Sequence, residues 1–209
     1  MTTPPPDESA VSAILLAGGR SSRMGSDKAS LMLAGQTLLQ RTMAVLSEVA
    51  AEIVIVHAPG QRLPAHESAV STTVIEDPVE GEGPLIGIAA GLRHAANETA
   101  LVVAVDMPFL QPSLLRLLAG RATTGRRIVV PMHLDRPQPL CSVFRRDALE
   151  TIDRRIEDGE RRIMAVADDL GAERLAPEGW SAADPDGRSF DNVNTPEEFE
   201  RALAVLGGE

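Results

Sequence analysis

Short apolar runs separated by segments of helical length constrain the fold of this chain more than any other feature. The runs are rich in β-branched residues and apolar on both faces, and they occupy residues 11–16, 53–56, 74–75, 101–105 and 128–130. Strands buried on both faces are typical of a mostly parallel sheet covered by helices. Between them, residues 85–94 and 112–118 have helical length and apolar spacing. The pattern predicts a three-layer, Rossmann-like α/β fold with a mostly parallel central sheet.

The rest of the chain continues this alternation. A strand is expected at 140–144, and amphipathic helices are expected at 148–156 and 161–170. Thr195 can cap a last helix that has Pro196 in its first turn,. The 209 residues hold no internal repeat or linker, so we expect one domain over 11–209, preceded by a polar, proline-rich, disordered leader over 1–10.

The overall charge and the cysteine count exclude several classes of protein. Twenty basic groups against 30 acidic ones give a net charge of -10, which repels polyanions and argues against a nucleic-acid partner. A single cysteine, Cys141, excludes an internal disulfide framework, and packing rather than catalysis is expected for it,. The four histidines have no metal-ligand spacing, so no zinc site is assigned. No signal peptide or membrane-spanning run is recognised, and a cytoplasmic protein without a membrane partner is expected.

The loop after the first strand concentrates positive charge. It contains Gly18 and Gly19, then Arg20 and Arg23, and it ends at Lys28, the only lysine of the chain. A compact ammonium at the end of a glycine-rich loop suits a phosphate. The loop matches neither the G-x-G-x-x-G fingerprint nor the Walker G-K-[ST] motif. The alternatives are a tight turn and a solvated surface lysine.

Three further polar positions follow predicted strands or precede the last helix. Asp106 follows the run at 101–105 and suits a hard cation such as Mg²⁺ bridging to phosphates,. Asp77 follows 74–75 and could accept hydrogen bonds from a base or a ribose. Asn192 and Asn194 could complete a metal shell or hold a second substrate,. Each could also be an ordinary turn or capping residue.

Together these motifs resemble the molybdenum cofactor guanylyltransferase family, in the family's order and over nearly the whole chain after the leader. The matching residues are Leu16-Ala17-Gly18-Gly19 to Lys28, Asp77 with Gly83-Pro84-Leu85, Asp106-Met107-Pro108, and Asn192-Val193-Asn194-Thr195-Pro196. The resemblance implies a nucleotidyltransferase that transfers GMP from GTP to the phosphate of molybdopterin or Mo-molybdopterin, releasing pyrophosphate. Other molybdenum cofactor assembly proteins would then be its partners.

The resemblance also implies roles for individual residues. The implied GTP-binding residues are Leu16, Ala17, Gly18, Gly19, Arg23, Lys28, Asp77, Gly83 and Asp106. Lys28 and Asp106 would be catalytic, Asp106 would hold Mg²⁺ with help from Asn194, and Asn192 and Asn194 would face the acceptor. The segment 138–140 is similar to the family's pterin-side loop. The chain departs from the pattern at 57–60, where some members carry asparagines and this chain reads His-Ala-Pro-Gly.

Two other functions stay open at the level of the sequence. A sister enzyme that uses CTP, or a different phosphate acceptor, would keep the first loop and Asp106. Related cytidylyltransferases carry Leu-Ala-Ala-Gly in the first loop and an aspartate at the position of Asn194, so Gly18 and Asn194 favour guanine. A non-catalytic module that binds a nucleotide or carries a cofactor is the alternative from another class.

Overall fold

The computed structural model describes residues 10–18, 27–79, 81–123 and 125–207. The predicted leader lies outside these residues, apart from Ala10. The strands are β1 (Val11–Leu16), β2 (Met32–Leu33), β3 (Gln36–Thr37), β4 (Glu52–His57), β5 (Ser71–Glu76), β6 (Thr99–Ala104), β7 (Ile128–His133), β8 (Arg136–Pro137), β9 (Cys141–Arg145) and β10 (Glu173–Leu175). The α-helices are α1 (Leu38–Ser47), α2 (Pro84–His94), α3 (Pro112–Arg121), α4 (Leu149–Glu157), α5 (Ile163–Asp169) and α6 (Pro196–Gly207).

The main sheet has the order β10-β7-β9-β6-β1-β4-β5, with β8 paired to β7. Strand β1 lies between β4 and β6 and is parallel to both, whereas β9 is antiparallel to β6 and β7. Leu16 is in register with Val56 of β4 and Ala104 of β6. The carboxyl ends of three neighbouring strands therefore lie at one edge of the sheet, which is where ligands bind in open α/β sheets.

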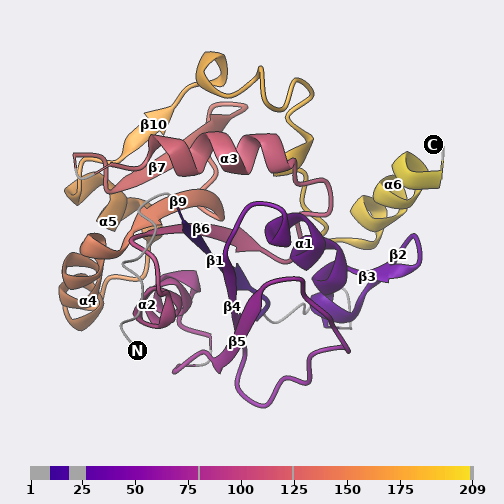
Figure 1. The fold of residues 1–209 in the computed structure, drawn as a ribbon, viewed down its shortest axis with the longest axis horizontal. Coiled ribbons are helices and arrows are strands. Elements are labelled where there is room, and N and C mark those ends of the chain that lie inside the picture. The colour runs from indigo at the N-terminus through magenta and orange to yellow at the C-terminus, as the bar shows by residue number, and fades with distance from the viewer. Residues whose placement is uncertain (1–9, 19–26, 80, 124, 208–209) are drawn as a thin grey trace, which may run out of the picture.

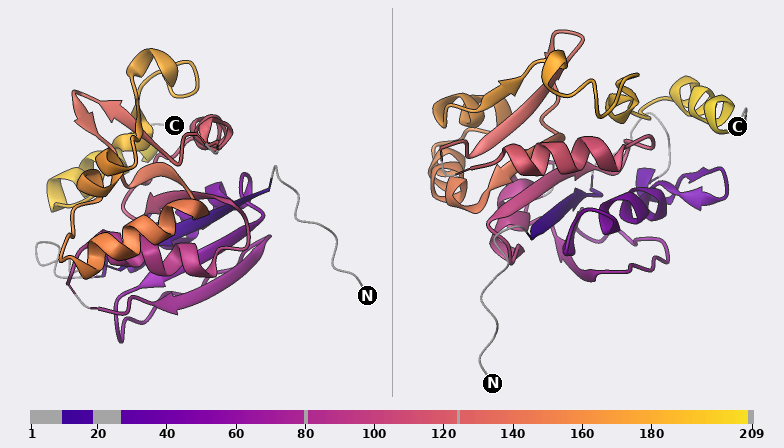
Figure 2. Two further views of the ribbon diagram at one scale, coloured as in Figure 1. Left: turned by 90° about the vertical axis from the view of Figure 1, so that its left-hand side faces the viewer. Right: turned by 45° about the horizontal axis from the view of Figure 1, so that its top comes forward.

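Helices cover both faces of the sheet, as Figures 1 and 2 show. Along β1, Ala13 and Leu15 pack on one side with α1, α3 and α6, while Ile14 and Leu16 pack on the other with α2, α4 and α5. This alternation follows from the two-residue period of a strand. The predicted three-layer fold with a mostly parallel sheet is confirmed.

The expectation that Cys141 is a packing residue is also confirmed. Cys141 is fully buried, and burial raises its pKa to about 12, which leaves the thiol protonated and unreactive at neutral pH,. Trp180 is only 4% exposed, and its indole Nε1 donates to the carbonyl of Met132 at 3.0 Å. Among the described residues, no helix has both the length and the apolarity required to cross a bilayer.

Some expectations about individual elements are corrected. The run at 74–75 was expected to be apolar on both faces, but it belongs to the edge strand β5, where Val74 is 45% exposed. The strand expected at 140–144 is β9, which begins at Cys141. The hairpin of β2 and β3 was not predicted. Its turn holds Ala34 and Gly35 at φ of 50° and 82°, a backbone that only Gly adopts without strain,.

Candidate functional site

Three side chains from distant parts of the chain meet beyond the carboxyl end of β1 and β6. The Lys28 ammonium donates to Asp106 Oδ2 and to Asn194 Oδ1, each at 2.6 Å. Lys28 and Asp106 are only 19% and 17% exposed. The structure therefore brings together the lysine, the carboxylate and one of the amides that the sequence singled out.

Backbone contacts fix the positions of Asp106 and Asn194 relative to the sheet. Asp106 is the second residue after β6, and the backbone amide of Val105, which lies between them, donates to the carbonyl of Leu16. The carbonyl of Asp106 accepts from the amide of Val193 at 2.9 Å, which ties the Asn192–Asn194 segment to the tip of the middle strand. Helix α6 then begins directly after Thr195, as predicted.

A capping interaction fixes the backbone of Asn194 at the start of α6. The Thr195 hydroxyl accepts from the amide of Glu198, and the Glu198 carboxylate accepts from the amides of Asn194 and Thr195. This reciprocal pattern satisfies donors at the helix start. Asn194 is thus held at a helix N-terminus, with its side-chain oxygen directed at Lys28.

Lys28 is positioned by a glutamine that the sequence analysis did not identify. Gln61 Nε2 donates to the Ala17 carbonyl at 3.0 Å and to Asp27 Oδ1 at 2.8 Å, while its Oε1 accepts from the amide of Ala58. Asp27 in turn caps the short 3-10 helix Lys28–Ser30 by accepting from Ala29. One side chain therefore links the loops after β1 and β4 to the residue before the lysine, and no local sequence pattern marks it.

Gly18 is required by the packing of the chain itself. A Cβ atom at Gly18 would lie 2.8 Å from the backbone nitrogen of Ala58. The amides of Ala17 and Gly18 both donate to the carbonyl of Val56. These two amides are therefore engaged within the protein. The rest of the glycine-rich loop is the segment 19–26. That segment includes the predicted positions Gly19, Arg20 and Arg23, and it lies outside the described residues.

Two adjoining cavities begin at this site. The first, of about 130 Å³, is lined by Leu16, Ala17, Gly18, Lys28 and Asp106, with Pro84, Ala104, Val105 and Leu140. The second, of about 340 Å³, is lined by Leu16, Gly18, Val56, Ala58, Pro59, Asp77, Gly81, Gly83, Pro84, Gly87 and Leu140. The shared residues join them into one groove that leads from Lys28 to Asp77. Residues 57–60, where the chain departs from the family pattern, contribute Ala58 and Pro59 to the wall of this groove.

Asp77 is the charged side chain at the far end of this groove. Burial raises the pKa of its carboxyl above the ordinary value, and a hydrogen bond from the amide of Val79 partly opposes the rise. A Cβ at Gly87 would lie 3.4 Å from Asp77 Oδ2 and 3.2 Å from the Leu16 side chain. The apolar wall and the single carboxylate suit a planar, polar ring with N–H donors.

A third cavity, of about 800 Å³, lies on the other side of Asn194. Its wall contains Asn192 and Asn194, the aromatic rings of Phe109, His133 and Phe190, the cations Arg136, Arg188 and Arg201, and Gln138. Asn192 thus faces this cavity and not the Lys28 pair, whereas Asn194 belongs to both. The predicted residues are divided between two compartments that meet at Asn194.

The donor set can accommodate a hard cation. Asp106 and Asn194 offer a carboxylate and an amide oxygen, and Mg²⁺ is typically held by one or two protein carboxylates together with substrate phosphates. In the described part of the chain, no three His, Cys, Asp or Glu side chains form a metal cluster. A dedicated all-protein cage is therefore not formed by these residues, and an ion here would depend on the phosphates of a ligand.

The chain is similar to known proteins in sequence and in fold. The family described as MobA-like NTP transferase domain matches residues 13–173. A curated relative from Desulfosudis oleivorans, named molybdenum cofactor guanylyltransferase, is 35% identical over 198 residues, covering 94% of this chain and 96% of the relative. Among solved structures, molybdopterin-guanine dinucleotide biosynthesis protein A from Archaeoglobus fulgidus is 28% identical with a TM-score of 0.79, covering 95% of this chain and 100% of that chain.

A more distant solved structure shares the fold alone. The 2-C-methyl-D-erythritol 4-phosphate cytidylyltransferase from Thermus thermophilus is 21% identical with a TM-score of 0.68, covering 93% of this chain and 98% of that chain.

Proposed function

Since this chain belongs to the MobA-like NTP transferase family, we propose that it transfers GMP from GTP to the terminal phosphate of molybdopterin or Mo-molybdopterin. The products are molybdopterin guanine dinucleotide and pyrophosphate. The observation that carries the proposal is the meeting of Lys28, Asp106 and Asn194 between a groove that ends at Asp77 and a larger cavity. The name of the relative that matches 94% of the chain supports the same reaction.

The reaction is an in-line displacement at phosphorus. An oxygen of the acceptor phosphate forms a bond to the α-phosphorus of GTP, and the bond from that phosphorus to the bridging oxygen of pyrophosphate breaks. The acceptor phosphate is already ionised near neutral pH, so no protein nucleophile is required. Catalysis then consists of positioning two anions and stabilising the charge that develops between them.

Lys28 would act on the triphosphate. Its ammonium has three N–H donors, of which Asp106 and Asn194 engage two within the described residues. These partners hold the ammonium beside the smaller cavity, where it can donate to a phosphate oxygen. Asp106 and Asn194 would also hold Mg²⁺, which when bound supplies neutralisation of phosphate charge.

Asp77 would recognise the guanine base through hydrogen bonds. A carboxylate can accept from both N1–H and the exocyclic N2 amino group of guanine, whereas cytosine presents only its N4 amino donor and an N3 acceptor. Asp77 lies in the second cavity together with Gly87, whose missing side chain leaves room beside the carboxylate. This arrangement favours GTP over CTP.

The third cavity would receive the acceptor. Its volume of about 800 Å³ is within the range of sites for cofactor-sized molecules. Asn192, Arg136, Arg188 and Arg201 line it, and Asn194 connects it to Lys28. Arginine side chains suit an anionic acceptor because they donate in a planar fork to phosphate oxygens.

The test is incubation of the protein with molybdopterin, Mg²⁺ and either GTP or CTP, followed by identification of the dinucleotide by mass spectrometry. We expect the guanine dinucleotide with GTP and little product with CTP. Comparable turnover with CTP would overturn the assignment of the base. Binding of GTP without any dinucleotide would instead favour the non-catalytic module.

A further inference from the structure

The loop that leads from β5 into α2 is held by an arginine from a different part of the chain. Glu82 lies between Gly81 and Gly83, which have φ of 79° and 93° and line the cavity of about 340 Å³. The Glu82 carboxylate accepts a hydrogen bond from Arg161 Nε and forms an ion pair with it. Arg161 precedes α5 and is 79 residues away in the sequence.

The Arg161 guanidinium is fixed from its own side as well. Its Nη1 donates to the carbonyl of Ile156 at the end of α4 and to the carbonyl of Glu160, both at 2.9 Å. A cation at this place also faces the negative end of the α4 dipole. The side chain is therefore a bridge between a helix end and the glycine-rich loop.

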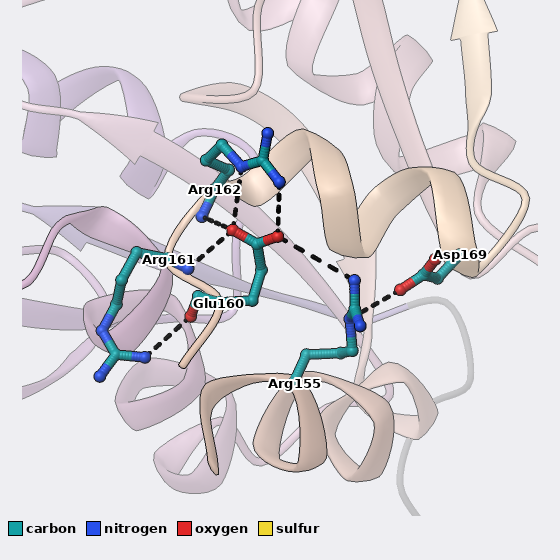
Figure 3. Close-up of polar contacts among 5 residues, drawn as sticks. All are labelled: Arg155, Glu160, Arg161, Arg162 and Asp169. Atoms are coloured by element: carbon teal, nitrogen blue, oxygen red, sulfur yellow. Dashed lines mark hydrogen bonds and ion pairs between the residues drawn. The ribbon is translucent and has the colours of Figure 1, made fainter. Parts of the chain in front are cut away.

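Glu160 holds the segment that carries Arg161 through several polar contacts (Figure 3). Its carboxylate accepts from the backbone amides of Arg161 and Arg162 at 2.9 Å and from the Arg162 guanidinium at 2.9 and 3.0 Å. These donors lower the pKa of Glu160 to about 2, so the carboxylate is ionised throughout the neutral range. Arg155 approaches the same carboxylate and also pairs with Asp169 at 2.8 Å, which joins α4 to α5.

We propose that Arg161 is a positioning residue that holds the Glu82–Gly83 segment in place beside the nucleotide pocket. The inference rests on the proposed function, because it assigns that groove to GTP. Two glycines make the loop costly to order, and a partly exposed ion pair by itself adds little to stability,. The expected consequence is therefore on nucleotide binding and not on folding.

Charge leads to the same conclusion. The groove must accept a triphosphate, yet Asp77 lines it, and Glu82 lies between the lining residues Gly81 and Gly83. Arg161 neutralises Glu82 at the place where the loop turns into α2. Loss of the arginine would both release the loop and leave an uncompensated negative charge near an anionic ligand.

The test combines Arg161→Ala, Glu82→Ala and the double variant with steady-state kinetics and hydrogen exchange. We expect each single variant to raise the KM for GTP roughly 10-fold, because a small displacement of a binding loop weakens the pose it holds. The double variant should be no worse than the poorer single one, and kcat and the KM for the acceptor should change less than about twofold. Glu82→Gln keeps an acceptor oxygen and should recover part of the loss.

The matched control is Arg174→Ala, which removes a half-exposed arginine that pairs with Asp168 of α5 at 2.6 Å. It should leave the KM for GTP unchanged. In the nucleotide-free protein, peptides containing Glu82 and Gly83 should exchange faster in Arg161→Ala than in wild type or in Arg174→Ala. Additive effects of the two single variants, or an unchanged KM with unchanged exchange, would overturn the proposal. If wild type transfers no GMP, the proposed function fails, while the exchange measurement still decides whether Arg161 holds the loop.

Discussion

The Lys28 ammonium lies 2.6 Å from the Asp106 carboxylate, and this pair joins the loop after β1 to the tip of β6. Both groups are mostly buried, so each needs the other as a partner while no ligand is bound,. In the proposed reaction the two groups have different roles. The ammonium would donate to phosphate oxygens, and the carboxylate would hold Mg²⁺. The ion pair between Lys28 and Asp106 therefore holds both groups beside the cavity and balances their charges.

Removal of either member of this pair should strongly lower turnover. We expect Lys28→Ala and Asp106→Ala each to lower kcat by at least ~100-fold, the scale lost with one strong transition-state contact. Lys28→Arg should also be impaired, because a planar fork cannot replace a compact ammonium between two oxygens. Arg116→Ala, which removes an exposed pair with Glu48, is the control. Near-full turnover by either alanine variant would contradict the assigned role.

The sequence predicted the parts of this site that follow from strand ends. Asp77 and Asp106 each come after an apolar run, and parallel strands bring such positions to one edge. Asn194 could be placed because Thr195 and Pro196 mark the start of a helix. By contrast, the exposure of Val74 depends on β5 lying at the sheet edge. Gln61 and Arg161 act through contacts made across folded loops, which no local period or motif encodes.

A methyl group at Gly18 should destabilise the protein through a backbone clash. The added Cβ would lie 2.8 Å from the nitrogen of Ala58, and neither backbone can move without disturbing the β1 and β4 ends. We expect Gly18→Ala to lower the free energy of unfolding by about 1–3 kcal/mol, measured by urea denaturation. Gly120→Ala is the matched control. It lies within α3 with nothing within 4 Å, so it should stabilise the protein by up to about 1 kcal/mol,. Equal stability of the two variants would refute the packing argument.

Neutralising Asp77 should weaken guanine recognition. We expect Asp77→Asn to raise the KM for GTP by about 10-fold or more, since hydrogen bonds to a charged acceptor contribute about 1.5–3 kcal/mol. In wild type, GTP binding should weaken as the pH falls. Because burial raises the pKa of Asp77, this loss should begin above the ordinary Asp range of about 3.9,. A KM that is the same in both proteins and independent of pH in this range would exclude Asp77 from base binding.

The ionised carboxylate of Asp77 should lower the free energy of unfolding at neutral pH. Its folded pKa lies above the unfolded value, so its titration favours the folded state in acid, and this contribution is lost as the pH rises through the folded pKa,. Asp77→Asn, which cannot ionise, should therefore unfold at a higher temperature than wild type at pH 7, with the difference diminishing towards pH 3. A lower melting temperature at pH 7 would show that Asp77 makes a stabilising contact in the ionised form.

Gln61 should affect catalysis although it lies away from the reacting groups. Its side chain holds Ala17, Asp27 and Ala58 together, and Asp27 caps the helix that begins with Lys28. We expect Gln61→Ala to lower kcat/KM for GTP roughly 10-fold through displacement of Lys28, and to reduce the free energy of unfolding by about 1–2 kcal/mol.

Gln61→Glu separates the hydrogen bonds from the volume of the side chain. A glutamate can still accept from the amide of Ala58, but it cannot donate to Ala17 and it brings a second negative charge to Asp27. It should therefore be more impaired than Gln61→Ala. Gln111→Ala removes only a local, exposed contact to the carbonyl of Phe109 and should match wild type. A Gln61→Glu enzyme as active as wild type would mean that Lys28 does not depend on this link.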